Sequence, residues 1–598
     1  MQKSRHTYEM GVIGNCAYMA HINKQGEIVW LCWPRFDSSF IFGKLIGGEQ
    51  AGFFAIEPED NNARYWQEYI ENTNILITHV DCEDGEYAIF DFAPRFYQYD
   101  RYYKPLMLVR KIKLIRGRPK IRIRCHPVDD YGNLKPRILM GSNHLRYAGL
   151  SEQIRLTTEL PLNYIKEEKF FHLTGTQYLF LTYGVPLEGP VRETGDMFFK
   201  RTLQYWRRFV RNANVPLIYQ EEFIRSMLVL KLHQYEDTGA IIASATTSLP
   251  ETPGSGRNWD YRYCWMRDAF YTLGALRSAG QGSEMEKYAS YIENLEHRSK
   301  NKFAPVYSIL GDGTLEERVL DLEGYMGNKP VRIGNQAAEH IQNDVYGQIL
   351  VSLLPLYIDK RFAGTSKPVT MSYIQNILKM IEKKMDEPDA GLWEFRNFSQ
   401  LHTYTYLFHW AGANSVMRIA VNRRWPKLYA YAEKIAKEAE KRIEQAYDAD
   451  RGVYTEAIGS SHLDASLLQL VTMRYLDPMS EKAKKHVEVL ARELGAKNGL
   501  FYRYKHTDDF GQPESTFFIC AFWYVEALAE IGEIEKATEN LEQLIRYGNH
   551  LGLFSEDVDE NTLSQWGNFP QTYSHVGLMN AVKKIADKLR KPEFLEYR

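Results

Sequence analysis

The spacing of apolar residues changes once along this chain, and the change divides it into two parts. Up to about residue 190, short runs alternate polar and apolar side chains, as half-buried β-strands do. From about residue 221, apolar residues recur at helical spacing instead. A chain of 598 residues is also too long for one ordinary hydrophobic core. We therefore expect a strand-rich domain followed by a helical domain.

The runs of the first part are typical of antiparallel strands in a β-sandwich. They cover residues 73–82, 87–96, 110–115, 120–128 and 177–185. The turn-like sequence Arg116-Gly117-Arg118-Pro119 joins the third run to the fourth. A helical pattern over residues 194–210 predicts a connector. We expect a sandwich domain over residues 1–192, a helical linker over 193–220 and an all-α domain over 221–598.

The second part alternates short and long connections between about twelve predicted helices. The predicted helices cover residues 222–237, 267–279, 283–299, 336–359, 370–385, 401–421, 425–447, 462–475, 480–492, 516–531, 533–548 and 573–590. The link before each even-numbered helix is long, and the link after it is short. If consecutive helices run antiparallel, all the long loops gather at one end. This rhythm favours a closed (α/α)6 barrel, with an open solenoid of helical pairs as the alternative.

Composition excludes several classes of partner. The 74 basic and 76 acidic residues give a net charge of −2, and no basic block favours nucleic acid or an anionic membrane surface. The start lacks an apolar stretch, and no run approaches the roughly 18 apolar residues of a membrane span. The six cysteines are widely separated, which favours reduced thiols and a cytoplasmic location. The 13% aromatic content favours a neutral, hydroxyl-rich ligand such as a sugar.

Two glutamates in the long loops form a candidate acid–base pair. Glu394 lies in GLWEFRN, and Glu556 lies in GLFSEDVDE. Hydrolysis of a glycosidic bond needs one protonated and one ionised carboxyl group. Burial of Glu394 between Trp393 and Phe395 would raise its pKa and favour the acid, and an exposed, ionised Glu556 would suit the base. The alternatives are a surface ion pair of Glu394 with Arg396 and a solvated acidic cluster around Glu556.

Two further loops carry candidate ligand-binding residues. In residues 257–270, Arg267 and Asp268 follow Trp265 at a predicted helix start, where they can hold sugar hydroxyls beside an aromatic ring. Capping of that helix by Asp268 is the alternative. In residues 321–340, Tyr325 and Arg332 are placed to line the same mouth. The chain has no phosphate-binding or dinucleotide motif, no HExxH and no GxSxG elbow, so these loops favour no other hydrolase class.

These segments, in their order along the chain, resemble glycoside hydrolase family 15, which includes glucoamylases, bacterial trehalases and glucodextranases. The matching segments are RNWDYRYCWMRDA, GYMGNKPVRIGN, LWEFR, SED and GNFPQTYSH. Residues 13–46 resemble the trehalase-like N-terminal domain found before the barrel in bacterial and archaeal members. The resemblance implies a β-supersandwich packed on an (α/α)6 barrel.

The resemblance also implies inverting, exo-acting hydrolysis of an α-glucosidic bond, with no metal or organic cofactor. Glu394 would be the general acid and Glu556 the general base. Arg267 and Asp268 would hold the terminal glucose of an α-linked oligosaccharide or disaccharide. The aromatic and basic neighbours Trp265, Trp393 and Arg396 would surround it.

The expected activity is glucoamylase-like release of glucose, with α,α-trehalase or α-1,6-acting glucodextranase as alternatives. A catalytically silent carbohydrate-binding or regulatory module is the alternative of another class, and retention of Glu394 and Glu556 argues against it. The chain departs from the family at Asn397, where a glycine is usual. It also has Thr403-Tyr404-Thr405-Tyr406 where Thr-His-Ser-Lys is common, so Tyr406 replaces a lysine near the proposed acid.

Overall fold

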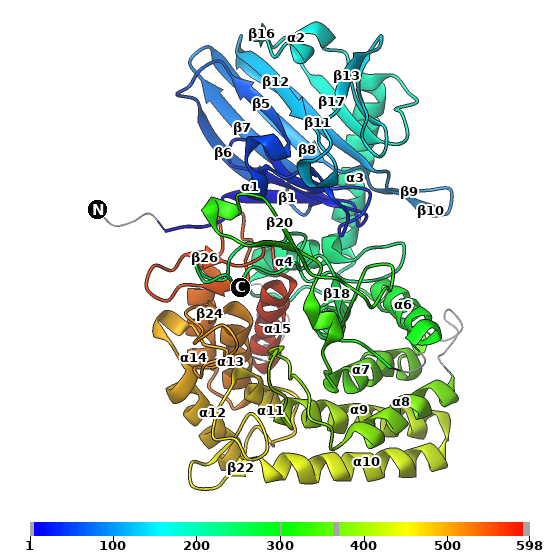
Figure 1. The fold of residues 1–598 in the computed structure, drawn as a ribbon, viewed down its shortest axis with the longest axis vertical. Helices are drawn as coiled ribbons and strands as arrows, with labels where there is room; N and C mark the ends of the chain where they lie inside the picture. Colours follow the sequence, from blue (N-terminus) through cyan, green and yellow to red (C-terminus); the bar gives the residue numbers. More distant parts are fainter. Residues whose placement is uncertain (1–4, 300–301, 363–369, 590–598) are drawn as a thin grey trace.

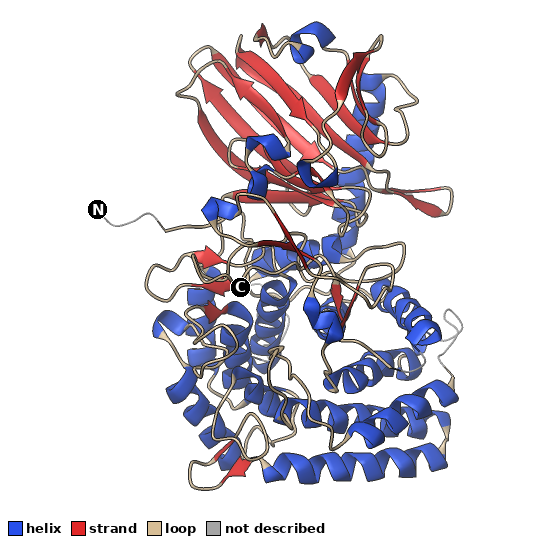
Figure 2. Cartoon of the chain, viewed as in Figure 1, coloured by secondary structure: helices blue, strands red, loops and turns tan. Residues whose placement is uncertain are grey.

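Strands and helices occupy separate ends of the molecule. The computed structural model describes residues 5–299, 302–362 and 370–589. Strands β1–β17 lie at one end, and helices α4–α15 lie at the other (Figure 1). Short strands also occur in the loops between those helices (Figure 2). The predicted order, an antiparallel β-sandwich followed by an (α/α)6 barrel, is confirmed. No helix within the described residues is both long and apolar enough to cross a membrane.

Two antiparallel sheets form the sandwich. The first contains β1 (Met10–Gly14), β2 (Met19–Asn23), β3 (Ile28–Cys32), β4 (Phe40–Phe42), β5 (Phe53–Pro58), β12 (Lys120–His126) and β16 (Phe171–His172). The second contains β6 (Arg64–Tyr69), β7 (Leu76–Cys82), β8 (Gly85–Phe92), β11 (Met107–Gly117), β13 (Arg137–Met140), β14 (His144–Ala148), β15 (Ile154–Thr158) and β17 (Gln177–Tyr183). The predicted turn at residues 116–119 therefore carries the chain from one sheet to the other and forms no hairpin between β11 and β12.

The first sheet is buried on both faces. Along β1, Val12 packs in the core shared with the barrel, whereas Ile13 packs in the core between the two sheets. In β2, Met19 packs in the core shared with the barrel, and Ala20 packs in the core between the two sheets. Neighbouring residues of a strand point to opposite faces, so each strand contributes to two cores. The sheet is therefore a middle layer between the second sheet and the helices.

Twelve helices of the described region form two concentric rings after the connector α3 (Val191–Arg211). The outer helices are α4 (Gln220–His233), α6 (Ser283–Ser299), α8 (Met371–Lys384), α10 (Pro426–Gln445), α12 (Glu481–Leu494) and α14 (Ile534–Ile545). The inner helices are α5 (Met266–Ser278), α7 (Asp344–Ile358), α9 (Thr403–Arg423), α11 (Gln469–Thr472), α13 (Phe518–Glu530) and α15 (Thr572–Leu589). Contacts connect α5 to α7 and α7 to α9, pass to α11 through the 3-10 turn Ala465–Leu468, and continue to α13 and α15, which closes the ring on α5.

The two rings differ in sequence because they differ in surroundings. Every residue of α13 is buried, whereas α10 buries one face at three- and four-residue spacing.

Two predicted helices are shorter than expected. Residues 336–339 form a separate 3-10 turn capped by the Asn335 side chain, and α7 begins at Asp344. The segment predicted over 462–475 contains a 3-10 turn and the single turn α11.

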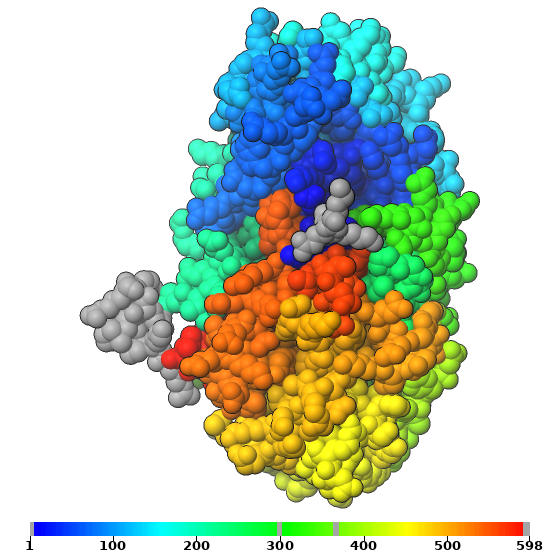
Figure 3. All heavy atoms as spheres, turned by 90° about the vertical axis from the view of Figure 1, so that its left-hand side faces the viewer, coloured from blue at the N-terminus to red at the C-terminus, as the bar shows by residue number. Residues whose placement is uncertain are grey.

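The two ends of the molecule are in direct contact (Figure 3). Asn549, in the loop after α14, donates from Nδ2 to the carbonyl oxygens of Tyr8 (2.7 Å) and Met10 (2.9 Å). Arg95, which follows β8, forms a buried ion pair with Glu236, which follows α4. Burial alone would raise the pKa of Glu236, but the Arg95 guanidinium lowers it well below its usual value. The two domains thus share apolar and ionic contacts.

Replacing Arg95 by Met is expected to destabilise the protein by about 3 kcal/mol. Breaking one side of a buried ion pair costs roughly 3–5 kcal/mol, and Lys287 still reaches Glu236, which places the cost at the low end. Urea unfolding followed by circular dichroism measures it. The control is Lys104→Met, whose partner Asp237 is 54% exposed and for which we expect a loss of about 1 kcal/mol or less. Equal losses in the two variants would contradict a specific role for Arg95.

Candidate active site

One cavity is formed by the loops that precede the inner helices. It encloses about 110 Å³. The loops before α5, α7, α9, α13 and α15 contribute, among others, Tyr261, Asn335, Glu394, Tyr504 and Glu556. Five of the six inner helices, all except α11, therefore begin near it, and the N-terminal end of a helix carries a partial positive charge. The long-loop rhythm of the sequence thus predicted five of the segments that meet here, whereas the loop before α11 contributes no residue to the lining.

Glu394 is held in a turn by three donors on one oxygen. Its Oε1 accepts from Nε1 of Trp265 at 2.7 Å and from Nη2 of Arg267 and Nε2 of Gln342 at 3.3 Å each. Its backbone φ of +64° is in the left-handed region, a strained conformation for a non-glycine residue. The Oε2 atom takes none of these donors and remains for a ligand. The side chain is 24% exposed and is therefore partly buried, and it pairs with Arg267, so the alternative ion pair with Arg396 does not occur.

Glu556 is the more buried of the two carboxylates, with 3% of the residue exposed. It precedes the short strand β25 (Asp557–Val558), which pairs with β24 (Thr516–Phe517) and β26 (Gln565–Trp566). Its Oε1 accepts from the Tyr261 hydroxyl at 2.7 Å, and its Oε2 has no hydrogen-bond partner among the described residues. Burial, and then the charges of Asp557 and Glu251, raise the pKa of Glu556 well above its usual value. The expectation of an exposed Glu556 is therefore wrong, and its burial disfavours the ionised form.

Two aromatic side chains connect the carboxylates. Tyr261 donates to Glu556, and Trp265 donates to Glu394. Their rings meet edge to face with centroids 5.4 Å apart. Both residues belong to the loop before α5, so one segment orients both candidate catalytic groups.

Arg267 and Asp268 occupy the first turn of α5, at the buried end of the cavity. Arg267 donates to the Tyr573 hydroxyl at 2.9 Å and to Oε1 of Gln342 at 2.9 Å. Asp268 is 3% exposed, and its burial raises its pKa to about 7. The helix cap itself is at Trp265, so Asp268 does not occupy the capping position.

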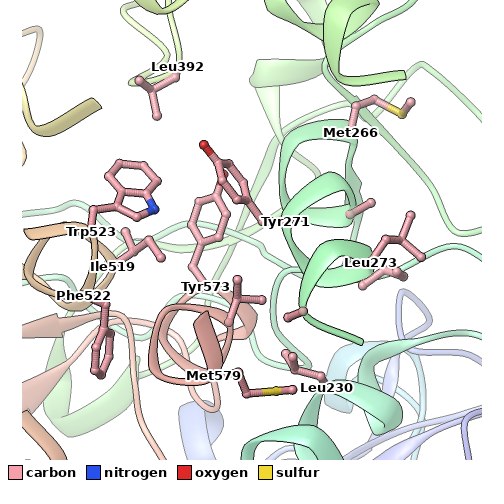
Figure 4. Packing of buried hydrophobic residues seen from close by; sticks show 14 of the residues in the cluster. Leu230, Met266, Tyr271, Leu273, Leu392, Ile519, Phe522, Trp523, Tyr573 and Met579 are labelled. Carbon is pink, nitrogen blue, oxygen red and sulfur yellow. The ribbon is translucent and has the colours of Figure 1, made fainter. Parts of the chain in front are cut away.

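Aromatic rings from three inner helices pack around this buried end. Tyr271 contacts Trp523 and Tyr573 with centroids 5.8 and 5.7 Å apart. Figure 4 shows the three rings grouped together, with Leu392 of the loop before α9 across from them. This packing makes the buried end of the cavity a rigid surface.

The remaining predicted residues are divided between the cavity wall and positions outside it. Trp393 lines the cavity and donates from Nε1 to Asp464 at 2.9 Å. Arg396 also lines it and pairs with Glu317 at 3.1 Å. Arg332 does not line the cavity, and its guanidinium lies 4.5 Å from the centroid of the ring of Trp259, which does. Tyr325 lies outside the lining.

Tyr325 instead contacts the N-terminal segment of the chain. Its hydroxyl lies 2.9 Å from Nε2 of His6, and its ring packs against Tyr8. The loop that carries it also meets the first domain, where the Gly324 amide donates to the Ile46 carbonyl oxygen at 2.8 Å. The position of Tyr325 thus does not support a direct role in ligand binding.

Several cavity residues were not predicted from the sequence. They are Tyr261, Glu251, Arg503, Tyr573 and the segment Asp508–Phe510; Gln342, which contacts Arg267 and Glu394 from outside the lining, was not predicted either. The last of these lies in the long loop before the tenth predicted helix, and that loop length was the available signal. The departure Tyr406 is buried in α9 outside the cavity lining, with its ring beside His409. It is therefore not a neighbour of Glu394 in the cavity.

The sequence of this chain matches the patterns of two known families. The sequence pattern of glycosyl hydrolases family 15 matches residues 218–583, and that of the trehalase-like N-terminal domain matches residues 3–169. A trehalase of Thermoplasma volcanium is 30% identical over 599 residues, covering 97% of this chain and 94% of the relative. A trehalase of Mycolicibacterium smegmatis is 30% identical, covering 96% and 91%. Trehalase 2 of Sulfolobus acidocaldarius is 29% identical, covering 95% and 98%.

Structural comparison agrees at the level of the fold. A bacterial glucoamylase complexed with acarbose superposes with a TM-score of 0.67 at 15% identity, covering 98% of this chain and 95% of that one. The similarity extends over both domains. This chain is a glycoside hydrolase and belongs to glycosyl hydrolase family 15.

Proposed function

We propose that this protein hydrolyses α,α-trehalose with inversion, with Glu394 as general acid and Glu556 as general base. The observation that supports it best is the placement of two carboxylates in one cavity, each oriented by a different donor of the loop before α5. Oε2 of Glu394 is free of those donors and can carry the proton for the leaving oxygen. Arg267 and Asp268, at the buried end, would hold the terminal glucose.

The choice of trehalose rests on the relatives that match along the whole chain and are named trehalases. This reverses the order expected from the sequence, where glucoamylase-like activity came first. The likeness to a bacterial glucoamylase at 15% identity supports the fold alone. Glucan 1,4-α-glucosidase activity is the second candidate because the terminal glucose would bind in the same way.

The charge of the lining favours an uncharged sugar. The arginines that line the cavity are Arg257, Arg267, Arg396 and Arg503. The acidic residues that line it are Glu251, Asp268, Glu394, Asp508, Asp509 and Glu556. Arg257, Arg396 and Arg503 are each paired with a carboxylate, so the lining offers little unpaired positive charge to a phosphorylated sugar.

The test is incubation with trehalose, maltose, isomaltose and maltoheptaose, with the released sugar followed by proton NMR. Inversion of trehalose yields one β-glucose from the attacked centre and one α-glucose as the leaving group. Retention yields two molecules of α-glucose before mutarotation. The second pattern would refute inversion, and an absence of hydrolysis of all four sugars would refute the proposed function.

The neighbouring carboxylate of Asp557 affects the pH at which Glu556 becomes ionised. A Cβ placed on Gly567 would lie 2.9 Å from Oε2 of Glu556 and 3.1 Å from Oδ2 of Asp557, so both oxygens border one small volume. Neither oxygen has a hydrogen-bond partner among the residues that the structure describes. Burial and the Asp557 charge raise the pKa of Glu556, while Tyr261 and Arg503 lower it. The base must be ionised, so activity rises with pH through this pKa.

Replacing Asp557 by Asn is therefore expected to move the acidic limb of the kcat/KM profile to lower pH by about one unit. The substitution removes a negative charge and leaves Glu251 as the remaining acidic neighbour that raises the pKa. Profiles of the variant and the wild type on trehalose measure the shift. Glu560→Gln, which removes a charge outside the cavity lining, is the control and should leave the limb in place. A shift to higher pH would contradict the prediction.

A further inference from the structure

The outer wall of the cavity is formed by the segment from Tyr504 to Gly511, which we name the rim segment. Phe510 of this segment is 40% exposed, whereas Asp268 at the opposite end is 3% exposed. Both residues line the cavity, so it runs from a buried end to an exposed rim. A sugar ring held by Asp268 and cleaved between Glu394 and Glu556 would leave the next ring facing this segment.

Asp509 ties the rim segment to the loop of the proposed acid. Its Oδ1 accepts from the backbone nitrogen and from Nδ2 of Asn397, at 3.1 and 2.6 Å. Its Oδ2 accepts from the backbone nitrogen of Arg396 at 2.6 Å. These donors follow Glu394 by two and three residues. The Asn397 side chain thus adds one donor to the two backbone donors.

Asp508 ties the same segment to the loop before α5. Arg257 donates to its two carboxylate oxygens at 2.9 and 2.6 Å, and the Tyr504 hydroxyl donates at 2.6 Å. Arg257 also donates to the Gly511 carbonyl oxygen at 3.0 Å. The side chains of Arg257 and Asp508 are 8% and 5% exposed. A bidentate pair this well shielded from water restrains the segment strongly.

An aromatic contact closes the wall between these two ties. The rings of Phe510 and Trp259 meet edge to face with centroids 5.1 Å apart. The guanidinium of Arg396 lies 4.6 Å from the centroid of Trp259 and 5.4 Å from that of Phe510. The segment is therefore attached on both sides and packed in the middle, as a fixed wall.

We propose that this wall restricts the substrate to two sugar rings, and that Asp509 acting through Asn397 is the residue pair that sets this limit. The inference rests on the proposed function and specifies substrate length within it. The cavity is buried at Asp268 and bounded at an exposed position by Phe510 of the rim segment. A third ring would have to pass through the position of the wall.

Calorimetric binding of maltose and maltoheptaose tests the proposal, because both present the same non-reducing glucose and binding needs no turnover. Hydrolysis is blocked in these measurements by combining each variant with Glu394→Gln. We expect maltoheptaose to bind at least tenfold more weakly than maltose. Asp509→Ala, which removes three accepted hydrogen bonds, should bring the two affinities within about threefold. Asn397→Gly, which removes one of the three, should give an intermediate ratio.

Two further variants complete the design. Phe510→Ala truncates an exposed rim side chain without disturbing the ties, and it should also reduce the ratio. Asp450→Ala, an exposed acid outside the cavity lining, should leave both affinities unchanged. Equal affinities for maltose and maltoheptaose in the Glu394→Gln protein would overturn the proposed limit of two rings. An unchanged ratio of these affinities in both the Asp509→Ala and Phe510→Ala variants would overturn the assignment of that limit to the rim segment. The proposed function fails by a separate result, the absence of hydrolysis by the wild type.

Discussion

Replacing Glu394 by Gln is expected to lower kcat on trehalose by about 1,000-fold, within the roughly 10²–10⁴-fold range of general acid catalysis. The amide has the same shape, and its oxygen can still accept from Trp265, Arg267 and Gln342. Its nitrogen would replace Oε2 and cannot supply the proton that the leaving sugar needs. The expected loss is therefore in kcat, with KM nearly unchanged.

α-Glucosyl fluoride separates this role from a structural one. Fluoride leaves without prior protonation, so the Glu394→Gln variant should hydrolyse it within about tenfold of the wild type, a far smaller loss than general acid catalysis is worth. The matched control on trehalose is Glu560→Gln, which should keep wild-type kcat. Equal losses on trehalose and on the fluoride would contradict the acid assignment.

The sequence was sufficient to predict the rings of helices and the loops that form the cavity. Every residue of α13 is buried, so its sequence is apolar apart from Glu526 and Glu530 and is easily recognised. The position of each long loop relative to its helix then placed Glu394 and Glu556 at one end of the barrel. Both patterns are local properties of the chain, which is why they could be read without a structure.

The surroundings of individual side chains depend on distant residues and could not be predicted in this way. The run SEDVDE reads as exposed, yet strand pairing of Asp557 with Phe517 and Trp566 buries Glu556 beside it. The position of Tyr325 could not be predicted for the same reason, because its partner His6 lies 319 positions away in the chain. The acidic residues around Glu556 predicted exposure to solvent, but pairing with strands that are distant in the sequence buries Glu556.

Replacing Glu556 by Gln is expected to abolish more than about 99.9% of kcat on both trehalose and α-glucosyl fluoride, at the upper part of the range for a lost base. Both substrates need an activated water, whatever their leaving group. The two glutamate variants therefore differ on the fluoride, and this difference assigns their roles. The raised pKa of Glu556 taken alone would fit a protonated acid. Retained fluoride hydrolysis by the Glu556 variant, with loss in the Glu394 variant, would reverse the assignment.

The same substitution should stabilise the fold at neutral pH. A carboxyl group whose pKa is raised by folding binds its proton more tightly in the native state, so its contribution is fully present below the usual value of 4.5 and is lost as pH rises. Gln carries no charge at any pH and can donate to the unpartnered Oδ2 of Asp557. We expect the Tm of Glu556→Gln to exceed that of the wild type at pH 7–8, with the difference vanishing near pH 4. A lower Tm at pH 7 would mean that the loss of activity has a structural cause.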